Sequence, residues 1–288
     1  MIAIAGGKGG CGKTTTTLGI ARSLEASGIG GRAIDLDAGM PNLHRMADVD
    51  REPPLAALVD EEGGAEIQRD SHGVEIVPAP RALAALDLSS ALDAVQPRDG
   101  VALFDCPAGA GPAATAPLRE AEAVILVSTS REESVEDAAK TGRMARSLGV
   151  PVLGAVVTRT QRVSRGVASE LAAEQTVAIP TRGEPLTDDR VRECYDAVAG
   201  WIETWLQRRG REKYSEAERS DTTVTVRKPA IRGDRSESRT CPCCGGIRPA
   251  RSSDERATDR RDRRSRRSRA ARGTRSSWRG GGALSGRR

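Results

Sequence analysis

The sequence predicts an α/β fold with a doubly wound, mainly parallel sheet, followed by a disordered basic tail, and three observations support this prediction. Short apolar runs alternate with segments of helical spacing over residues 1–207, as they do when helices cover both faces of a parallel sheet. A glycine-rich stretch joins the first apolar run to the first helical segment. Residues 208–288 are rich in Arg, Ser and Gly and poor in large apolar residues, so we expect a disordered basic tail there.

The expected elements alternate along the chain. Buried strands are expected where apolar residues run together, at 2–6, 32–37, 74–78, 101–105, 123–128, 151–157 and 177–179. Helices are expected where apolar residues recur three and four positions apart, at 13–27, 82–95, 134–148, 165–174 and 188–207, with a short helix at 55–60. The rest of segment 41–72 is polar and irregular. Ligands of such sheets bind at the carboxyl ends of the strands.

The glycine-rich stretch carries the clearest chemical signal. Residues 7–14 fit the phosphate-binding loop pattern G-x-x-x-x-G-K-[ST], at the strand-to-helix junction that this loop requires. Its glycines let backbone N–H groups turn inward around an anion, and the following helix adds the positive end of its dipole. We expect Lys13 to reach the β- and γ-phosphates and the Thr14 hydroxyl to bind Mg²⁺. The stretch predicts a P-loop NTPase domain whose nucleotide-binding residues are Gly7, Lys8, Gly9, Gly10, Cys11, Gly12, Lys13, Thr14 and Thr15.

Acidic residues end two of the predicted strands. Asp35 and Asp37 alternate along strand 32–37, so they lie on the same side of it near its end. Asp105 ends the apolar strand 101–105 and is expected to hold Mg²⁺, through water, together with Thr14. A capping or turn role remains the alternative for Asp35 and Asp37.

Taken in order, these motifs resemble those of the MinD/ParA family of ATPases, which have a deviant Walker A loop. The resemblance covers residues 1–206. It is carried by Lys8-Gly9-Gly10-Cys11-Gly12-Lys13-Thr14-Thr15, by Asp35-Leu36-Asp37-Ala38-Gly39-Met40-Pro41-Asn42-Leu43, and by Asp105-Cys106-Pro107-Ala108-Gly109.

The resemblance implies catalytic roles for Lys8, Lys13 and Asp37. Lys8 would reach across a dimer interface to the nucleotide of the partner subunit. Asp37 matches the aspartate that orients the attacking water, and Asp35 a supporting or metal-shell carboxylate. Lys13, Mg²⁺ and the partner's Lys8 would then stabilise the charge on the transferring phosphoryl group.

Three later residues match positions near the nucleotide base in the family. Thr158 and Arg159 stand where the family often has Asn-Arg beside the adenine, with Thr in place of Asn. Ile179-Pro180 matches an Ile-Pro pair that ends a later strand. Thr158, Arg159 and Pro180 are therefore expected among the nucleotide-binding residues.

The resemblance implies an Mg²⁺-dependent, ATP-hydrolysing dimeric switch in the placement of the division site or in chromosome, plasmid or protein partitioning. The expected partners are a second copy of the chain on ATP binding and a protein activator; the sequence does not decide between a DNA and a membrane surface. Two alternatives stay open. An iron–sulfur carrier would need a Cys-x-x-Cys pair at the dimer interface, which the three cysteines of the domain do not provide. A non-hydrolysing recruitment module would not need both Asp37 and Asp105.

The last predicted helix has an apolar face that allows two interpretations. The first interpretation is a closing helix that packs on the sheet, and the apolar pattern favours it. The other is a membrane-targeting amphipathic helix that inserts Trp201, Ile202, Trp205 and Leu206 into lipid. That element stands at the extreme C-terminus in the family, whereas here the tail follows.

Charge and cysteine content bound the remaining possibilities. Residues 1–206 hold 20 Lys and Arg against 30 Asp and Glu, whereas residues 207–288 hold 25 against 10, so the net charge of +5 does not indicate a nucleic-acid-binding domain. The basic run 260–269 is either an unspecific contact for anionic surfaces or a solvated tail. Cys241, Cys243 and Cys244 have no second pair of cysteine or histidine ligands at zinc-site spacing, which argues against a metal site. Metal binding at these three cysteines stays an open alternative.

The cysteine content and the start of the sequence predict a cytoplasmic protein that could associate peripherally with the membrane or the nucleoid. The cysteines show no disulfide-like spacing, and the first strand begins at once, without a signal peptide. No apolar run approaches the ~20 residues that span a bilayer.

Overall fold

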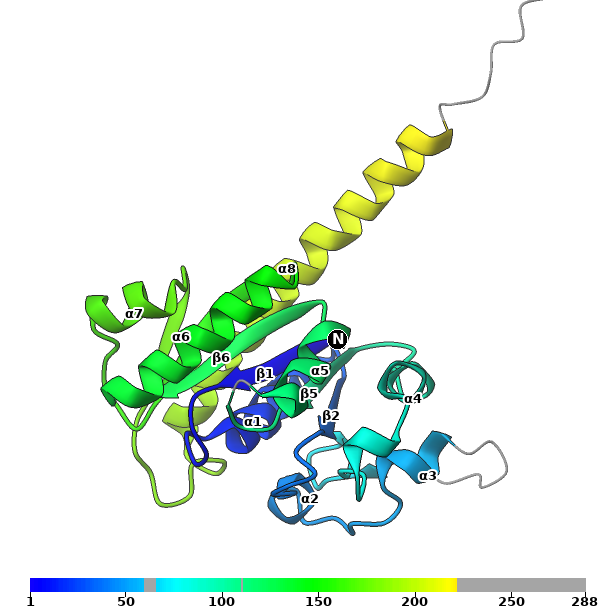
Figure 1. The fold of residues 1–288 in the computed structure, drawn as a ribbon, viewed down its shortest axis with the longest axis horizontal. Helices are drawn as coiled ribbons and strands as arrows, with labels where there is room; N and C mark the ends of the chain where they lie inside the picture. The colour runs from blue at the N-terminus through cyan, green and yellow to red at the C-terminus, as the bar shows by residue number, and fades with distance from the viewer. Residues whose placement is uncertain (60–65, 110, 222–288) are drawn as a thin grey trace, which may run out of the picture. The chain divides into compact units, whose positions relative to one another are not determined.

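The computed structural model describes residues 1–59, 66–109 and 111–221, and they have the predicted α/β architecture (Figure 1). Over these residues, eight strands form one sheet in the order β3-β4-β2-β5-β1-β6-β7-β8, in which every pair is parallel except β3–β4. The strands are β1 (Ile2–Gly6), β2 (Gly31–Asp35), β3 (Gln68–Arg69), β4 (Glu75–Val77), β5 (Val101–Asp105), β6 (Ala123–Thr129), β7 (Val152–Thr158) and β8 (Thr176–Ile179).

Helices cover both faces of the sheet, and α1 and α8 lie on the face opposite α5 and α6 (Figure 1). The helices are α1 (Lys13–Ala26), α2 (Leu43–Met46), α3 (Leu55–Val59), α4 (Leu88–Ala94), α5 (Pro112–Glu120), α6 (Glu132–Ser147), α7 (Arg165–Leu171) and α8 (Asp189–Asp221), with a 3₁₀ turn η1 (Leu83–Ala85). The predicted fold class is confirmed.

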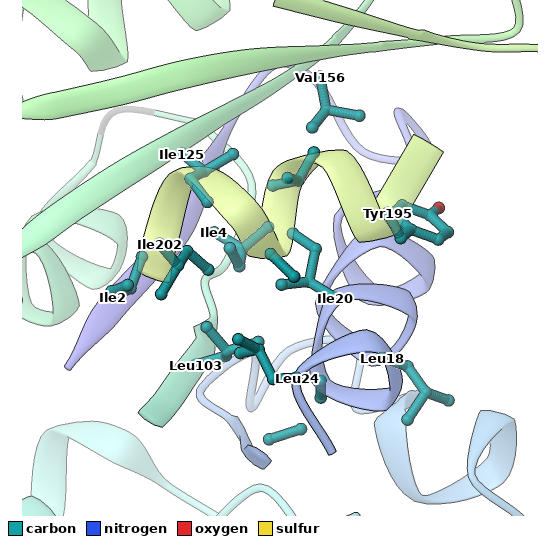
Figure 2. Close-up of a cluster of buried hydrophobic side chains, with 14 of the residues drawn as sticks. Ile2, Ile4, Leu18, Ile20, Leu24, Leu103, Ile125, Val156, Tyr195 and Ile202 are labelled. Atoms are coloured by element: carbon teal, nitrogen blue, oxygen red, sulfur yellow. The ribbon is translucent and has the colours of Figure 1, made fainter. Parts of the chain in front are cut away.

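The alternation of side chains along β1 divides the core into two layers. Ile2 and Ile4 face the layer under α1 and α8, whereas Ala3 and Ala5 face the layer under α5 and α6. Figure 2 shows Ile2 and Ile4 beside Ile20 of α1 and Ile202 of α8. All these strand residues are buried, as expected of a central parallel strand.

Several element boundaries differ from the prediction. The predicted helix 82–95 is divided into η1 and α4, because the backbone at Leu86 and Asp87 is extended. Helix α7 ends at Leu171, since Ala172 adopts a left-handed conformation with φ 47°. Sequence analysis missed α2, β3 and α5. Pro112 stands in the first turn of α5, where a missing N–H costs little.

The last helix is longer than predicted. Helix α8 continues to Asp221, beyond the predicted end at Gln207. Arg209 explains part of this extension, because its guanidinium lies 4.9 Å from the Trp205 ring centroid and bonds the Glu122 carboxylate at 2.6 Å. The remaining tail, 222–288, with Cys241, Cys243, Cys244 and the basic run, lies outside the described residues.

The apolar face of α8 packs on the sheet. Ile202 is fully buried, and Trp201, Trp205 and Leu206 pack partly buried against the same core layer. A Cβ atom on Gly154 of β7 would lie 2.5 Å from the Trp201 ring, so this glycine makes room for the indole. The closing-helix interpretation describes this packing, and a membrane anchor would have to withdraw these side chains from the core. Among the helices of the described residues, none has the length and apolarity needed to cross a bilayer.

Two helical glycines provide a matched test of this packing. A Cβ on Gly19 of α1 would lie 2.3 Å from the Tyr195 ring, whereas a Cβ on Gly200 of α8 would meet nothing within 4 Å. Gly19→Ala is expected to lower the free energy of unfolding by about 1–3 kcal/mol through overpacking. Gly200→Ala should raise it by up to about 1 kcal/mol through helix propensity. Denaturant titration measures both, and a stabilised Gly19→Ala chain would contradict the packing of α1 on α8.

Candidate functional site

The glycine-rich loop connects β1 to α1 at the carboxyl edge of the sheet. A Cβ on Gly6 would lie 2.5 Å from the Val127 carbonyl oxygen of β6, and Gly6 has φ 134°, so only glycine fits there. The Gly7 N–H donates to the same carbonyl at 3.0 Å. Gly12, with φ 97°, precedes α1 and has no side chain to cap it, which leaves the N–H groups of the first turn available to an anion.

Side chains from the end of β7, from the residue after it and from α6 hold the shape of the loop. The Thr158 hydroxyl donates to the Cys11 carbonyl at 2.7 Å, and the Arg159 guanidinium donates to the Gly10 carbonyl at 2.7 Å. On the other side, the Ser134 hydroxyl accepts from the Thr129 N–H at 3.0 Å, and a Cβ on Gly7 would lie 2.7 Å from it. The phosphate-binding loop is thus preformed by contacts within the chain.

Asp35 anchors the segment that follows β2. Its Oδ1 accepts from the Asp37 N–H at 2.9 Å, and its Oδ2 accepts from the Asn42 and Leu43 N–H groups at 3.2 Å each. Burial raises the pKa of Asp35 to about 6, although these backbone donors oppose the shift. Because both oxygens are engaged, the turn role accounts for Asp35, and a place in the metal shell stays a prediction.

Asp37 lies two residues beyond the end of β2, so the prediction that strand 32–37 carries both aspartates is wrong, and Asp37 is half-buried. Its Oδ1 accepts from the Met40 N–H at 3.1 Å, which fixes the carboxylate at the start of the anchored segment. The role of Asp37 in orienting water stays a prediction.

Asp105 is the least satisfied polar group of the site. It stands beside Asp35 in the β2–β5 register, it is 2% exposed, and within the described residues its Oδ1 has no hydrogen-bond partner. Burial and then the charge of Asp35 raise its pKa to about 8, while the nearby Thr14 hydroxyl and Lys13 ammonium oppose the shift. A buried, unpartnered carboxylate oxygen next to a hydroxyl is a donor set that Mg²⁺ accepts, so these residues fit that ion.

The raised pKa of Asp105 makes the stability of the nucleotide-free chain depend on pH. Between about pH 4 and pH 8 the folded chain keeps a proton that the unfolded chain has lost, so stability falls as pH rises through this window. Asp105→Asn removes the buried charge, and its Tm in EDTA at pH 8 should exceed that of the wild type by about 5 °C. The two chains should converge near pH 4. Equal melting temperatures at pH 8 would mean that Asp105 is solvated.

Lys8 is exposed and bound to its own chain. Its ammonium lies 2.5 Å from a carboxylate oxygen of Glu133, in the first turn of α6, and this hydrogen bond raises the pKa of Lys8. Lys8 and Glu133 line a cavity of about 300 Å³ together with Gly9, Gly10 and Cys11. Sequence analysis missed Glu133, since an acidic residue at a helix start normally serves the helix dipole.

The three residues expected near the base lie together beside the loop. Thr158, Arg159 and Pro180 line a second cavity, of about 160 Å³, with Gly12 and Thr15. Ile179, Thr181, Arg182, Pro185 and Tyr195 also line this cavity; Arg182 and Tyr195 were not predicted, because no motif marks them. Together with Lys13, which is buried, and Thr14, every predicted loop residue lies at this edge of the sheet.

The described cysteines do not form a metal site. Cys11 and Cys106 are buried, Cys194 is partly buried, and none of the three is in a disulfide. Over residues 1–59, 66–109 and 111–221, no three His, Cys, Asp or Glu side chains are grouped to hold a metal ion by themselves.

Comparison with known proteins gives consistent matches. Residues 2–194 match the family described as the CobQ/CobB/MinD/ParA nucleotide binding domain. The chain is 30% identical over 204 residues to an uncharacterised ATP-binding protein of Methanocaldococcus jannaschii, which covers 67% of this chain and 76% of that protein. It is 30% identical over 181 residues to an iron–sulfur cluster carrier protein of Methanococcus maripaludis, covering 54% and 58%. Among solved structures, the septum site-determining protein MinD of Pyrococcus horikoshii, complexed with Mg-ADP, superposes with a TM-score of 0.61 at 22% identity, over 71% of this chain and 96% of that one.

Proposed function

This chain belongs to the CobQ/CobB/MinD/ParA nucleotide-binding domain family, and we propose that it is an Mg²⁺-dependent ATPase that works as a dimeric switch. The observation that carries the proposal is the unpartnered, buried Asp105 oxygen beside Thr14 and Lys13, at the open N-terminus of α1. A buried carboxylate without a partner is costly, and a bound cation offsets that cost. The relative from Methanocaldococcus jannaschii, named as ATP-binding, supports ATP as the nucleotide.

The proposed binding mode uses the preformed loop. Backbone N–H groups of residues 9–14 and the Lys13 ammonium would hold the phosphates, and Thr14 and Asp105 would hold Mg²⁺. When bound, Mg²⁺ neutralises phosphate charge. The second cavity, lined by Thr158, Arg159 and Pro180, would take the base.

Hydrolysis would depend on Asp37 and on a second copy of the chain. Asp37 stands two residues beyond the carboxyl end of β2, fixed by the Met40 N–H, and is proposed to orient the attacking water. Lys8 is held by Glu133 within one chain, so its proposed role at the partner's nucleotide requires it to leave this ion pair. Both Lys8 and Glu133 are exposed, so their ion pair is weak, and breaking it to contact the partner's nucleotide costs little free energy. ATP would thereby control dimerisation, as a switch for placing the division site or for partitioning.

A second candidate is an ATP-dependent iron–sulfur carrier, which the relative from Methanococcus maripaludis supports. The chain spans 58% of that relative. Cys11 and Cys106 are buried in the domain, so they are poor ligands for an exchangeable cluster. Reconstitution with iron and sulfide tests this alternative by the visible absorption of a cluster.

The proposal is tested by measuring phosphate release and the mass of the chain in solution with ATP, with ADP and without nucleotide. ATP turnover with a dimer in ATP alone is expected. Nucleotide binding without turnover would instead support the recruitment module. Pelleting with DNA and, separately, with anionic liposomes under ATP and ADP then identifies the surface; a chain ending at Asp221 excludes unspecific binding by the basic tail.

A further inference from the structure

A further cavity, of about 300 Å³, lies between α1 and the start of α8, and we call it the α1–α8 cavity. Its lining includes Arg22, Ser23, His72, Leu186, Tyr195 and Asp196. Among the described residues that line it, none belongs to the phosphate-binding loop. Its volume is at the lower end of the range for small-molecule sites, so a ligand of this cavity is small.

Arg22 is held in the α1–α8 cavity by a buried carboxylate. Its Nε donates to the Asp70 Oδ2 at 2.8 Å, and the Asp70 side chain is fully buried. The Oδ1 of Asp70 accepts from the His72 and Val74 N–H groups, at 2.8 and 3.0 Å, and so fixes the turn that carries His72. Within the described part of the chain, neither Nη atom of Arg22 donates to an acceptor. These two atoms form a positioned pair of donors, which matches a carboxylate.

Ser23 brings a buried hydroxyl to the same cavity. The residue is 5% exposed, and over the described residues its Oγ has no hydrogen-bond partner. A Ser or Thr inside a helix commonly bonds the carbonyl one turn before it, as the Thr17 hydroxyl of α1 does with the Lys13 carbonyl at 3.0 Å. Because a buried hydroxyl without a partner costs free energy, a ligand with a polar group beside Ser23 is favoured.

A carboxylate lines the same cavity without pairing with Arg22. Asp196 is exposed on α8, and among the described residues it forms no ion pair. Arg192, which also lines the cavity, is exposed and bonds the Asp189 carboxylate at 2.9 Å. The cavity thus offers a fixed guanidinium and a free carboxylate at separate points. A ligand with one negative and one positive charge matches both, whereas Asp196 repels an ion that is only negative.

Apolar surface completes the α1–α8 cavity. Leu186 packs partly buried against the core, and the Tyr195 ring lies against α1 (Figure 2). From these contacts we propose that the cavity binds a free α-amino acid with an apolar side chain. Its carboxylate bonds the Nη atoms of Arg22 and the Ser23 hydroxyl, its ammonium pairs with Asp196, and its side chain covers Leu186 and Tyr195. The proposal requires no nucleotide, so it is tested separately from the proposed function.

The test is calorimetric titration of the full chain, without nucleotide, with L-leucine as the probe. Isocaproate and isoamylamine have the same branched carbon chain but carry only the carboxylate or only the ammonium. L-Leucine should bind with a Kd below about 1 mM, and the two single-charge analogues at least about tenfold more weakly. Inorganic phosphate should not compete.

Ser23→Ala separates a binding role from a structural one. Removing an unpartnered buried hydroxyl should leave the Tm at or above that of the wild type, yet weaken L-leucine by about three- to tenfold. A residue that only supports the fold would not combine weaker binding with unchanged stability. Arg22→Lys keeps a positive charge beside Asp70 but loses the planar pair of donors, so it should weaken both L-leucine and isocaproate.

Two carboxylates of α8 provide a matched pair of variants. Asp196→Asn should weaken L-leucine by about tenfold and leave isocaproate unchanged, because only the ammonium contacts Asp196. Glu193→Gln removes the same charge from an exposed residue that does not line the cavity, and it should change neither ligand. The proposal is overturned if L-leucine does not bind the wild type at about 10 mM, if inorganic phosphate displaces it, or if Asp196→Asn binds it as the wild type does.

Discussion

A chain carrying Lys8→Ala is expected to bind ATP within about threefold of the wild type and to remain monomeric in ATP. Lys8 lies outside the cradle formed by Lys13 and the open end of α1, and in a single chain it contacts Glu133 instead. Replacing Lys8 therefore removes only its proposed contact with the nucleotide of a second copy. If the partner's Lys8 stabilises the transferring phosphoryl group as a trans-acting arginine does, turnover should fall by about 10³-fold or more. Light scattering with ATP and phosphate release measure both effects.

Two variants serve as controls for this result. Lys140→Ala removes an exposed lysine from α6, whose partners are Glu136 and Asp137, and should leave dimerisation and turnover intact. Glu133→Gln breaks the ion pair that holds Lys8 within one chain, and it should permit dimerisation at the wild-type ATP concentration or below it. A Lys8→Ala chain that still dimerises in ATP would refute the trans role.

The sequence predicts the loop and its neighbouring strands well because their signals are local. Strand β1 is apolar throughout, and the glycines around Lys13 are required by backbone conformation, so spacing alone identifies them. The parallel pairing of the strands also follows from βα alternation. The strand order that places Asp35 beside Asp105 does not, because alternation leaves open which strands are neighbours.

The contacts that sequence analysis missed join residues far apart in the chain. The ion pair of Lys8 with Glu133 and the bond of Thr158 to Cys11 connect segments that no spacing pattern relates. The division of the predicted helix 82–95 has a different cause. Its apolar residues keep helical spacing, yet the backbone is extended at Leu86 and Asp87, and pattern alone does not detect a short extended break.

Variants of Asp35, the last residue of β2, and of Asp37, two residues beyond it, are expected to fail in different ways, and this difference tests the proposed hydrolysis. Asp37 makes one bond to the Met40 N–H and is half-buried, whereas Asp35 is fully buried and accepts from three N–H groups. Asp37→Ala should lower turnover by about 10²–10⁴-fold, the usual loss for a residue that directs proton transfer, with little change in Tm.

Because its ATP would persist, the Asp37→Ala chain should stay dimeric in ATP for longer than the wild type. Asp35→Ala should instead lower the free energy of unfolding by about 2 kcal/mol, since it leaves buried donors without an acceptor. Turnover, Tm and the lifetime of the ATP dimer distinguish the two variants. If Asp37→Ala hydrolyses ATP at the wild-type rate, the water is oriented elsewhere; if Asp35→Ala is stable but inactive, Asp35 belongs to the metal shell and its turn contacts are secondary.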